Sequence, residues 1–119
     1  MEIGKNNWAI AEGYIPKESH GKFPELESHE TVCMLNAGDS PANVEIMIYF
    51  SDREPLGPFH EVVEARRTKH LRFNSLEIPK GKDFASTIKS DVPIVVQHTR
   101  LDSRQAENAL MTTIAYAQN

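Results

Sequence analysis

The stretch VEIMIYF, residues 44–50, decides the fold class of this chain. Its apolar side chains Val44, Ile46 and Ile48 alternate with Glu45 and Tyr49. Successive side chains of a β-strand point to opposite faces of a sheet, so this alternation predicts a strand with one well-buried face.

Further apolar runs lie on both sides of this stretch, and turn residues such as Gly38, Pro55 and Gly57 separate them. The strand-like runs are residues 8–11 (WAIA), 31–35 (TVCML), 59–63 (FHEVV) and 92–96 (VPIVV). The last run is apolar on both parities and predicts a central strand that starts at Pro93, because proline cannot donate to the ladder. About seven or eight short strands predict an all-β fold, an antiparallel β-sandwich or jelly-roll-like single domain over residues 1–119.

Two segments fit this pattern less simply. Residues 83–88 (DFASTI) predict a short helical turn capped by Asp83. Residues 104–118 fit a helical stripe and a period-2 alternation equally well. The β-branched Thr112 and Thr113 favour the strand.

Composition narrows the class of protein. The chain has 119 residues, 39% hydrophobic content and a net charge of −4. No apolar stretch approaches the roughly 20 residues that a membrane helix needs, and no signal peptide is visible, which predicts a cytoplasmic protein without membrane insertion. The net negative charge argues weakly against general nucleic-acid binding. The lone Cys33 lies within the apolar run 31–35, so it is predicted to be buried and slow to react.

Motifs of catalysis or metal binding are lacking, so the sequence predicts a non-enzyme without a metal or cofactor. The five histidines have no metal-ligand spacing. Ser28, His29 and Asp39 are present as residue types, but no nucleophile lies in a glycine-flanked elbow. The histidines are His20, His29, His60, His70 and His98.

A basic run covers residues 65–73 (ARRTKHLRF). Strand alternation places Arg66, His70 and Arg72 on one face, and Arg67 and Lys69 on the apolar parity. Two interpretations stay open: a solvated edge strand whose charges discourage pairing, or a face that meets a partner. As a nucleic-acid surface the run offers charge for phosphates, but no interleaved aromatic residues for base stacking.

A second polar concentration follows the run at 92–96 and contains His98, Arg100, Asp102 and Arg104. Arg100 and Asp102 share a face if the strand continues, and a guanidinium oriented in this way suits a carboxylate or phosphate partner. A structural ion-pair network within or between subunits is the favoured alternative.

Long, compositionally unusual segments of this chain resemble the sensory rhodopsin transducer family. They are residues 8–16 (WAIAEGYIP), 28–33 (SHETVC), 35–39 (LNAGD), 65–70 (ARRTKH) and 92–116, including HTRLDSRQAEN at 98–108. The resemblance covers nearly the whole chain in one order. The loops at 17–23 and 74–82 depart from the family pattern, and loops are where partner contacts usually lie.

The resemblance implies a small cytoplasmic β-sandwich that forms a homotetramer and binds the cytoplasmic side of a retinal photoreceptor. Three functional hypotheses follow. The first is a signal-transducing adaptor for a membrane receptor. The second is a small-ligand or carbohydrate-binding module, with Trp8, Tyr14 and Tyr49 as candidate stacking residues. The third is a DNA-associated transcriptional regulator that uses Arg66, Arg67, Lys69 and Arg72.

Overall fold

The computed structural model describes residues 2–23, 27–105 and 108–119. Within these ranges the chain forms antiparallel strands and one short 3-10 helix, η1 (Phe73–Leu76). The strands are β1 (Lys5–Ile10), β2 (His29–Asn36), β3 (Ala42–Phe50), β4 (Leu56–Val63), β5 (Arg67–Arg72), β6 (Phe84–Asp102), β7 (Ala109–Ile114) and β8 (Tyr116–Gln118). The predicted all-β sandwich is confirmed. None of the described helices is long and apolar enough to cross a bilayer.

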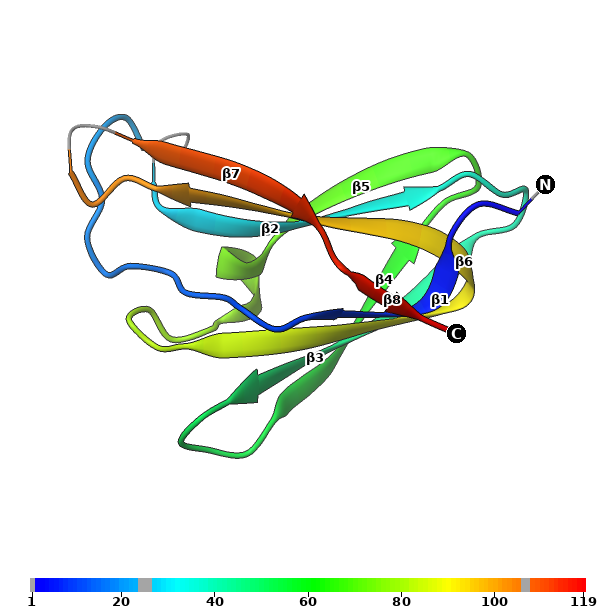
Figure 1. Ribbon diagram of the computed structural model, residues 1–119, viewed down its shortest axis with the longest axis horizontal. Helices are drawn as coiled ribbons and strands as arrows, with labels where there is room; N and C mark the ends of the chain where they lie inside the picture. Colours follow the sequence, from blue (N-terminus) through cyan, green and yellow to red (C-terminus); the bar gives the residue numbers. More distant parts are fainter. Residues whose placement is uncertain (1, 24–26, 106–107) are drawn as a thin grey trace.

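The strands form two layers, which lie one above the other in Figure 1. The first sheet has the order β4-β3-β6-β1-β8, and the second has the order β5-β2-β6-β7. Strand β6 belongs to both, because its first half pairs with β1 and β3 and its second half pairs with β2 and β7. This one long strand therefore joins the two layers at the bend seen on the right of Figure 1.

The core lies between the two layers, and the stretch 44–50 supplies part of it as predicted. Val44, Ile46 and Ile48 are buried, whereas Glu45 and Tyr49 are exposed. The same alternation in β2 buries Val32 and Met34. The core therefore forms where the apolar parities of facing strands meet.

The helical turn predicted for residues 83–88 was wrong, because these residues begin β6. Phe84 and Ile88 point into the core with Ser86 between them, and β1 and β3 pair with this segment from both sides. Pairing with β1 and β3 gives hydrogen bonds to backbone groups along the whole segment. These hydrogen bonds outweigh the local capping signal at Asp83.

The predicted strand start at Pro93 was also wrong, because Pro93 lies near the middle of β6. The last residue paired with β3 is Ser90, and the first paired with β2 is Val95. Proline lacks a backbone N–H, and it is tolerated here because β6 passes from one sheet to the other between those two residues.

The strand favoured for the C-terminal segment is confirmed as β7, which pairs with β6. Residues 106 and 107 of this segment lie outside the described part of the chain. The prediction that Cys33 is buried was wrong. The side chain is half-buried, because strand alternation turns Val32 and Met34 inward and Cys33 outward. Its Sγ lies 3.8 Å from the hydroxyl of Thr99 on the outer face of the second sheet.

Candidate functional site

Glu30 of β2 is a carboxylate enclosed in the interior, with a fully buried side chain. The ring Nε2 of His98 on β6 donates to its Oε1. The backbone N–H of Tyr14 donates to Oε2 at 2.6 Å, and the Nε of Arg100 lies 3.6 Å from the same oxygen. A buried charge is costly unless it is paired and hydrogen-bonded, and these partners satisfy both oxygens of Glu30.

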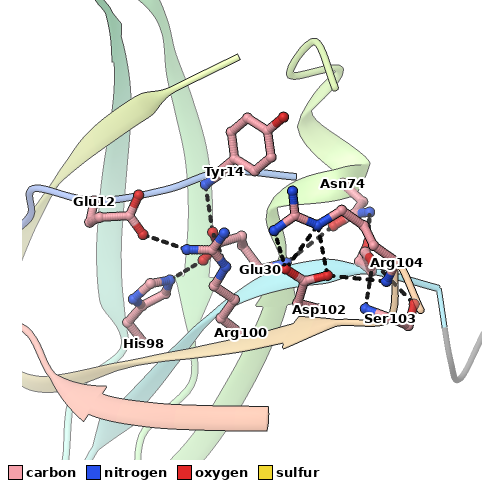
Figure 2. Close-up of polar contacts among 10 residues, drawn as sticks. Glu12, Tyr14, Glu30, Asn74, His98, Arg100, Asp102, Ser103 and Arg104 are labelled. Atoms are coloured by element: carbon pink, nitrogen blue, oxygen red, sulfur yellow. Dashed lines mark hydrogen bonds and ion pairs between the residues drawn. The ribbon is translucent and has the colours of Figure 1, made fainter. Parts of the chain in front are cut away.

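Arg100 extends this cluster toward the surface (Figure 2). Its Nη1 lies 2.7 Å from Oε1 of Glu12, a residue between β1 and β2. Its guanidinium also lies over the ring of Tyr14, 5.9 Å from the ring centroid. Arg100 therefore joins a buried carboxylate to an exposed one, and so ties the described parts of the connector between β1 and β2, residues 11–23 and 27–28, to β6.

Asp102 and Arg104 form a second ion pair beside the first. The guanidinium of Arg104 donates to both carboxylate oxygens of Asp102, with a shortest distance of 2.6 Å. Hydrogen bonds from the Arg104 side chain are the main reason that the pKa of Asp102 lies below its usual range. The same hydrogen bond raises the pKa of Arg104. Arg104 lies 5.7 Å from the Tyr14 ring centroid, so this ring contacts two guanidinium groups.

Polar contacts also hold the rest of the connector to the end of β6. The hydroxyls of Ser28 and Ser103 lie 3.1 Å apart, and the backbone N–H of His20 donates to the Ser103 carbonyl at 2.6 Å. The amide of Asn74, from η1, donates to the Ser28 carbonyl. The ionic cluster is thus one end of a polar seam between the connector and β6.

The structure divides the predicted site residues into two groups. His98, Arg100, Asp102 and Arg104 come together at the connector, whereas the basic residues lie two strands away on β5. Arg100 and Asp102 do not form an ion pair with each other. Arg100 forms ion pairs with Glu30 and Glu12, and Asp102 forms one with Arg104. The sequence favoured a structural ion-pair network within or between subunits, and the ion pairs described here lie within one chain.

The basic strand β5 lies at a sheet edge and pairs with β2 alone among the described strands. Arg67 and His70 are exposed, and Lys69 forms an ion pair with Glu61 of β4 at 2.8 Å. Arg66 lies in the turn before β5, with a positive φ of 57°. The remaining ion pairs of this region are Arg66–Asp39 at 2.9 Å and Arg72–Glu27 at 3.7 Å.

Sequence reasoning missed Glu12, Tyr14 and Glu30 as members of the cluster. A signal for Glu30 was present, because it shares the parity of Val32 and Met34 and therefore had to point into the core. The connector residues carried no such signal, since residues 11–23 and 27–28 lie outside the named strands. Across the described ranges, no group of three or more His, Cys, Asp or Glu side chains is placed to hold a metal ion.

These features define an antiparallel β-sandwich with a buried, internally paired ionic cluster that holds a long connector. The chain matches the Anabaena sensory rhodopsin transducer family over residues 3–117, and it belongs to that family. No curated protein matches it.

Two solved structures are similar to this chain. The Anabaena sensory rhodopsin transducer shares 59% sequence identity, with a TM-score of 0.74 over 83% of this chain and 99% of that one. The crystal structure of Thermotoga maritima 1070 shares 36% identity, with a TM-score of 0.89 over 97% of this chain and 96% of that one.

Proposed function

We propose that this protein is a cytoplasmic signal-transducing adaptor that binds the cytoplasmic side of a membrane receptor, a sensory rhodopsin or a related receptor, without catalysing a reaction. The observation that carries the proposal is family membership over residues 3–117 together with 59% identity to a protein named a sensory rhodopsin transducer. Identity at this level extends over most of the chain, so surface segments as well as the core are shared.

The geometry of the ionic cluster supports a structural and binding role over a catalytic one. Both oxygens of Glu30 and the guanidinium of Arg104 are occupied by partners from the same chain. A general base or a nucleophile must instead face a space that a substrate can enter. The cluster therefore supports a role in holding the described residues of the connector, 11–23 and 27–28, in one position.

An adaptor transmits a signal only if its partner binds two of its states with different affinity, and about 1–3 kcal/mol of coupling is typical. The packed core between the layers offers few alternative arrangements. The connector is held by side-chain contacts from Glu30 and Arg100 and by single backbone hydrogen bonds rather than by a continuous ladder. We place the responsive element there, with Arg100, Asp102 and Arg104 as the binding residues beside it.

A homotetramer is the second part of the proposal. The family resemblance motivates it, together with a strand edge, β7, whose apolar side chains are exposed in the single chain. Light scattering at micromolar concentration tests this part directly. A tetramer mass is expected, and a monomer mass contradicts the oligomer.

The alternative functions receive less support. Arg66, Lys69 and Arg72 are paired with carboxylates of the same chain, which weakens the attraction of β5 for DNA phosphates. Trp8 is buried, and its indole N–H donates to the carbonyls of Lys5 and Ile94, so its ring does not offer a stacking surface. The ring of Tyr14 already contacts two guanidinium groups of the same chain, which leaves Tyr49, exposed at 40%, as the candidate stacking residue for a small ligand.

Biolayer interferometry tests the adaptor proposal. The probe is retinal-loaded Anabaena sensory rhodopsin in nanodiscs, with empty nanodiscs as the control. We expect specific, saturable binding with a micromolar or lower Kd, and we expect the double variant Arg100→Gln, Arg104→Gln to bind at least tenfold more weakly. Arg53→Gln, on the far loop after β3, is the matched control and should bind as the unaltered protein does. Binding equal to that of empty nanodiscs contradicts the photoreceptor form of the proposal.

A further inference from the structure

Two loops of this chain depart from the family pattern, at residues 17–23 and 74–82, and the structure brings them together at one pocket. The pocket has a volume of about 300 Å³. Its lining consists of Tyr14, Pro16, Lys17, Glu18, Gly81 and Arg104. The backbone N–H of Gly81 donates to the carbonyl of Ile15 at 2.7 Å, which fixes the second loop against the connector. The pocket therefore lies where the two departing loops meet.

The side chain of Lys17 is held beside Gly81 in this pocket. A Cβ atom added at Gly81 would lie 2.8 Å from Cε of Lys17, so the lysine stem lies directly over this glycine. Gly81 also has a φ of 74°, a conformation that favours glycine. Lys17 is exposed, and across residues 2–23, 27–105 and 108–119 its ammonium group forms no ion pair or hydrogen bond. The ammonium group is therefore available to an external acceptor.

Arg104 contributes a second available donor. Its Nε and Nη2 donate to the carboxylate of Asp102, whereas Nη1 donates to no group in the described part of the chain. The same guanidinium lies beside the ring of Tyr14 (Figure 2). A guanidinium presents five N–H donors in a planar fork, so one edge can hold Asp102 while Nη1 meets a second acceptor. Lys17 and Arg104 thus offer two cationic donors to one pocket.

The charges around the pocket favour a single carboxylate as its occupant. Glu18 also lines the pocket, so two cations are offset by one anion. Segments that adsorb to anionic membranes carry about four to eight Lys or Arg residues close together, and the whole chain has a net charge of −4. A lone carboxylate needs only a few charge-assisted hydrogen bonds, which an ammonium and a guanidinium group supply.

An occupant of this pocket lies beside the element that the proposed function treats as responsive. Tyr14 lines the pocket, and its backbone N–H donates to Oε2 of the buried Glu30 at 2.6 Å. A carboxylate that binds Arg104 also competes with Asp102 for the same guanidinium. The pocket is therefore connected to the buried ionic cluster through Tyr14 and to the end of β6 through Arg104.

We propose that this pocket binds a glutamate or aspartate side chain on the cytoplasmic surface of the receptor, between the ammonium group of Lys17 and Nη1 of Arg104. This inference rests on the proposed function and gives the receptor contact a defined chemistry. Because both loops of the pocket depart from the family pattern, the pocket also determines which receptor this chain accepts.

A cycle of two modifications tests the contact. Retinal-loaded Anabaena sensory rhodopsin in phosphatidylcholine nanodiscs is used either unmodified or with its surface carboxylates converted to neutral amides by carbodiimide and ethanolamine. Receptor-free nanodiscs treated in the same way are the blank. Lys17→Gln removes one cation of the pocket. Lys89→Gln is the matched control, because Lys89 of β6 is also exposed and forms no ion pair with a described residue.

We expect amidation of the receptor to weaken binding of the unaltered protein at least tenfold. Lys17→Gln should weaken binding to the unmodified receptor at least fivefold and have no further effect on binding to the amidated one. Lys89→Gln should bind as the unaltered protein does. If Lys17→Gln weakens binding to both receptor forms equally, the carboxylate contact is wrong, although the adaptor function stands. Binding to receptor-free phosphatidylglycerol nanodiscs that Lys17→Gln abolishes assigns the pocket to lipid headgroups and overturns the proposal.

A measurement without receptor separates a failure of the pocket from a failure of the proposed function. The probe is N-acetylglutamate α-amide, which carries one side-chain carboxylate, and N-acetylglutamine α-amide is its neutral isostere. NMR spectroscopy of the isotope-labelled protein should show saturable shifts of the backbone amides of Lys17 and Gly81 with the charged probe only. Lys17→Gln should abolish them.

The absence of these shifts in the unaltered protein, or equal shifts with the neutral probe, overturns the carboxylate pocket. A protein that shows the shifts but does not bind the receptor keeps the carboxylate pocket, and the failure then lies in the proposed function.

Discussion

The imidazole of His98 donates to the carboxylate of Glu30 inside the sandwich, where the two side chains are only 4% and 0% exposed. The residues are 68 positions apart in the chain, and they meet as diagonal neighbours because β2 and β6 are adjacent in the second sheet. This pair is the inner end of a network whose outer end reaches Glu12 and Tyr14. The connector is thus anchored near Glu12 and Tyr14 from the interior of the protein, and not only at its surface.

Glu30→Ala should lower the free energy of unfolding by about 3–5 kcal/mol, because it leaves His98 and Arg100 without their buried partner. Urea denaturation measures the loss. Glu12→Ala is the matched control: its side chain is 62% exposed, so removing it should cost about 1 kcal/mol or less. Glu30→Gln removes the charge but keeps the side-chain volume, and it serves if the alanine variant does not fold. Equal losses for Glu30→Ala and Glu12→Ala would show that burial of the pair is unimportant.

Ile46→Ala should lower the free energy of unfolding by about 2–5 kcal/mol, because Ile46 is fully buried between the layers. The neighbouring Tyr49→Ala should cost about 1 kcal/mol or less, since this side chain lies on the solvent face of the same strand. Thermal unfolding followed by circular dichroism compares the two variants. Similar melting temperatures for both would contradict the assigned faces of β3.

The pair formed by Asp102 and Arg104 should make stability depend on pH in the acidic range. The folded-state pKa of Asp102 is lowered, so its contribution is present above about pH 4, the usual range of an aspartate, and is lost as pH falls through the lower folded-state pKa. Arg104→Gln should therefore unfold at a slightly lower temperature than the unaltered protein near neutral pH, and the difference should be small because Arg104 is half-exposed and solvent screens the pair.

This difference should shrink as pH falls below about 4 and through the lowered folded-state pKa of Asp102, because a protonated carboxyl group no longer forms the ion pair. Arg67→Gln is the matched control, because Arg67 forms no ion pair with any described residue and its substitution should give no pH-dependent difference. Melting temperatures measured from acidic to neutral pH check the prediction. A constant difference between Arg104→Gln and the unaltered protein at every pH would refute it.

Cys33 should react with a thiol reagent in the native state, because it lies on the outer face of β2 and is half-buried. Its labelling rate should not change in urea concentrations too low to unfold the protein. In a Cys33→Ser background, Val32→Cys places a thiol on the buried parity and should react at least tenfold more slowly. Similar rates for the two thiols would mean that the register of β2 is wrong.

Local sequence patterns predicted the structure of some segments correctly and of others wrongly. Alternation in residues 44–50 predicted a buried face correctly, and the β-branched Thr112 and Thr113 correctly favoured a strand at β7. Alternation also carried the information that Glu30 points inward. The failures were at residues 83–88 and at Pro93, where pairing with neighbouring strands outweighed a local capping signal and a local proline rule, and at Cys33, which alternation turns outward.

The amino-acid sequence by itself determined the class of fold, the parity of most strands and the family, because side-chain alternation and family motifs are properties of neighbouring residues. Only the tertiary structure decided that a single 19-residue strand, β6, serves both sheets. It also decided which charges meet: Arg100 and Glu12 are 88 positions apart, and Glu30 and His98 are 68 apart. Such partners depend on which strands become neighbours and on what covers them, and the packing of the whole sandwich sets both.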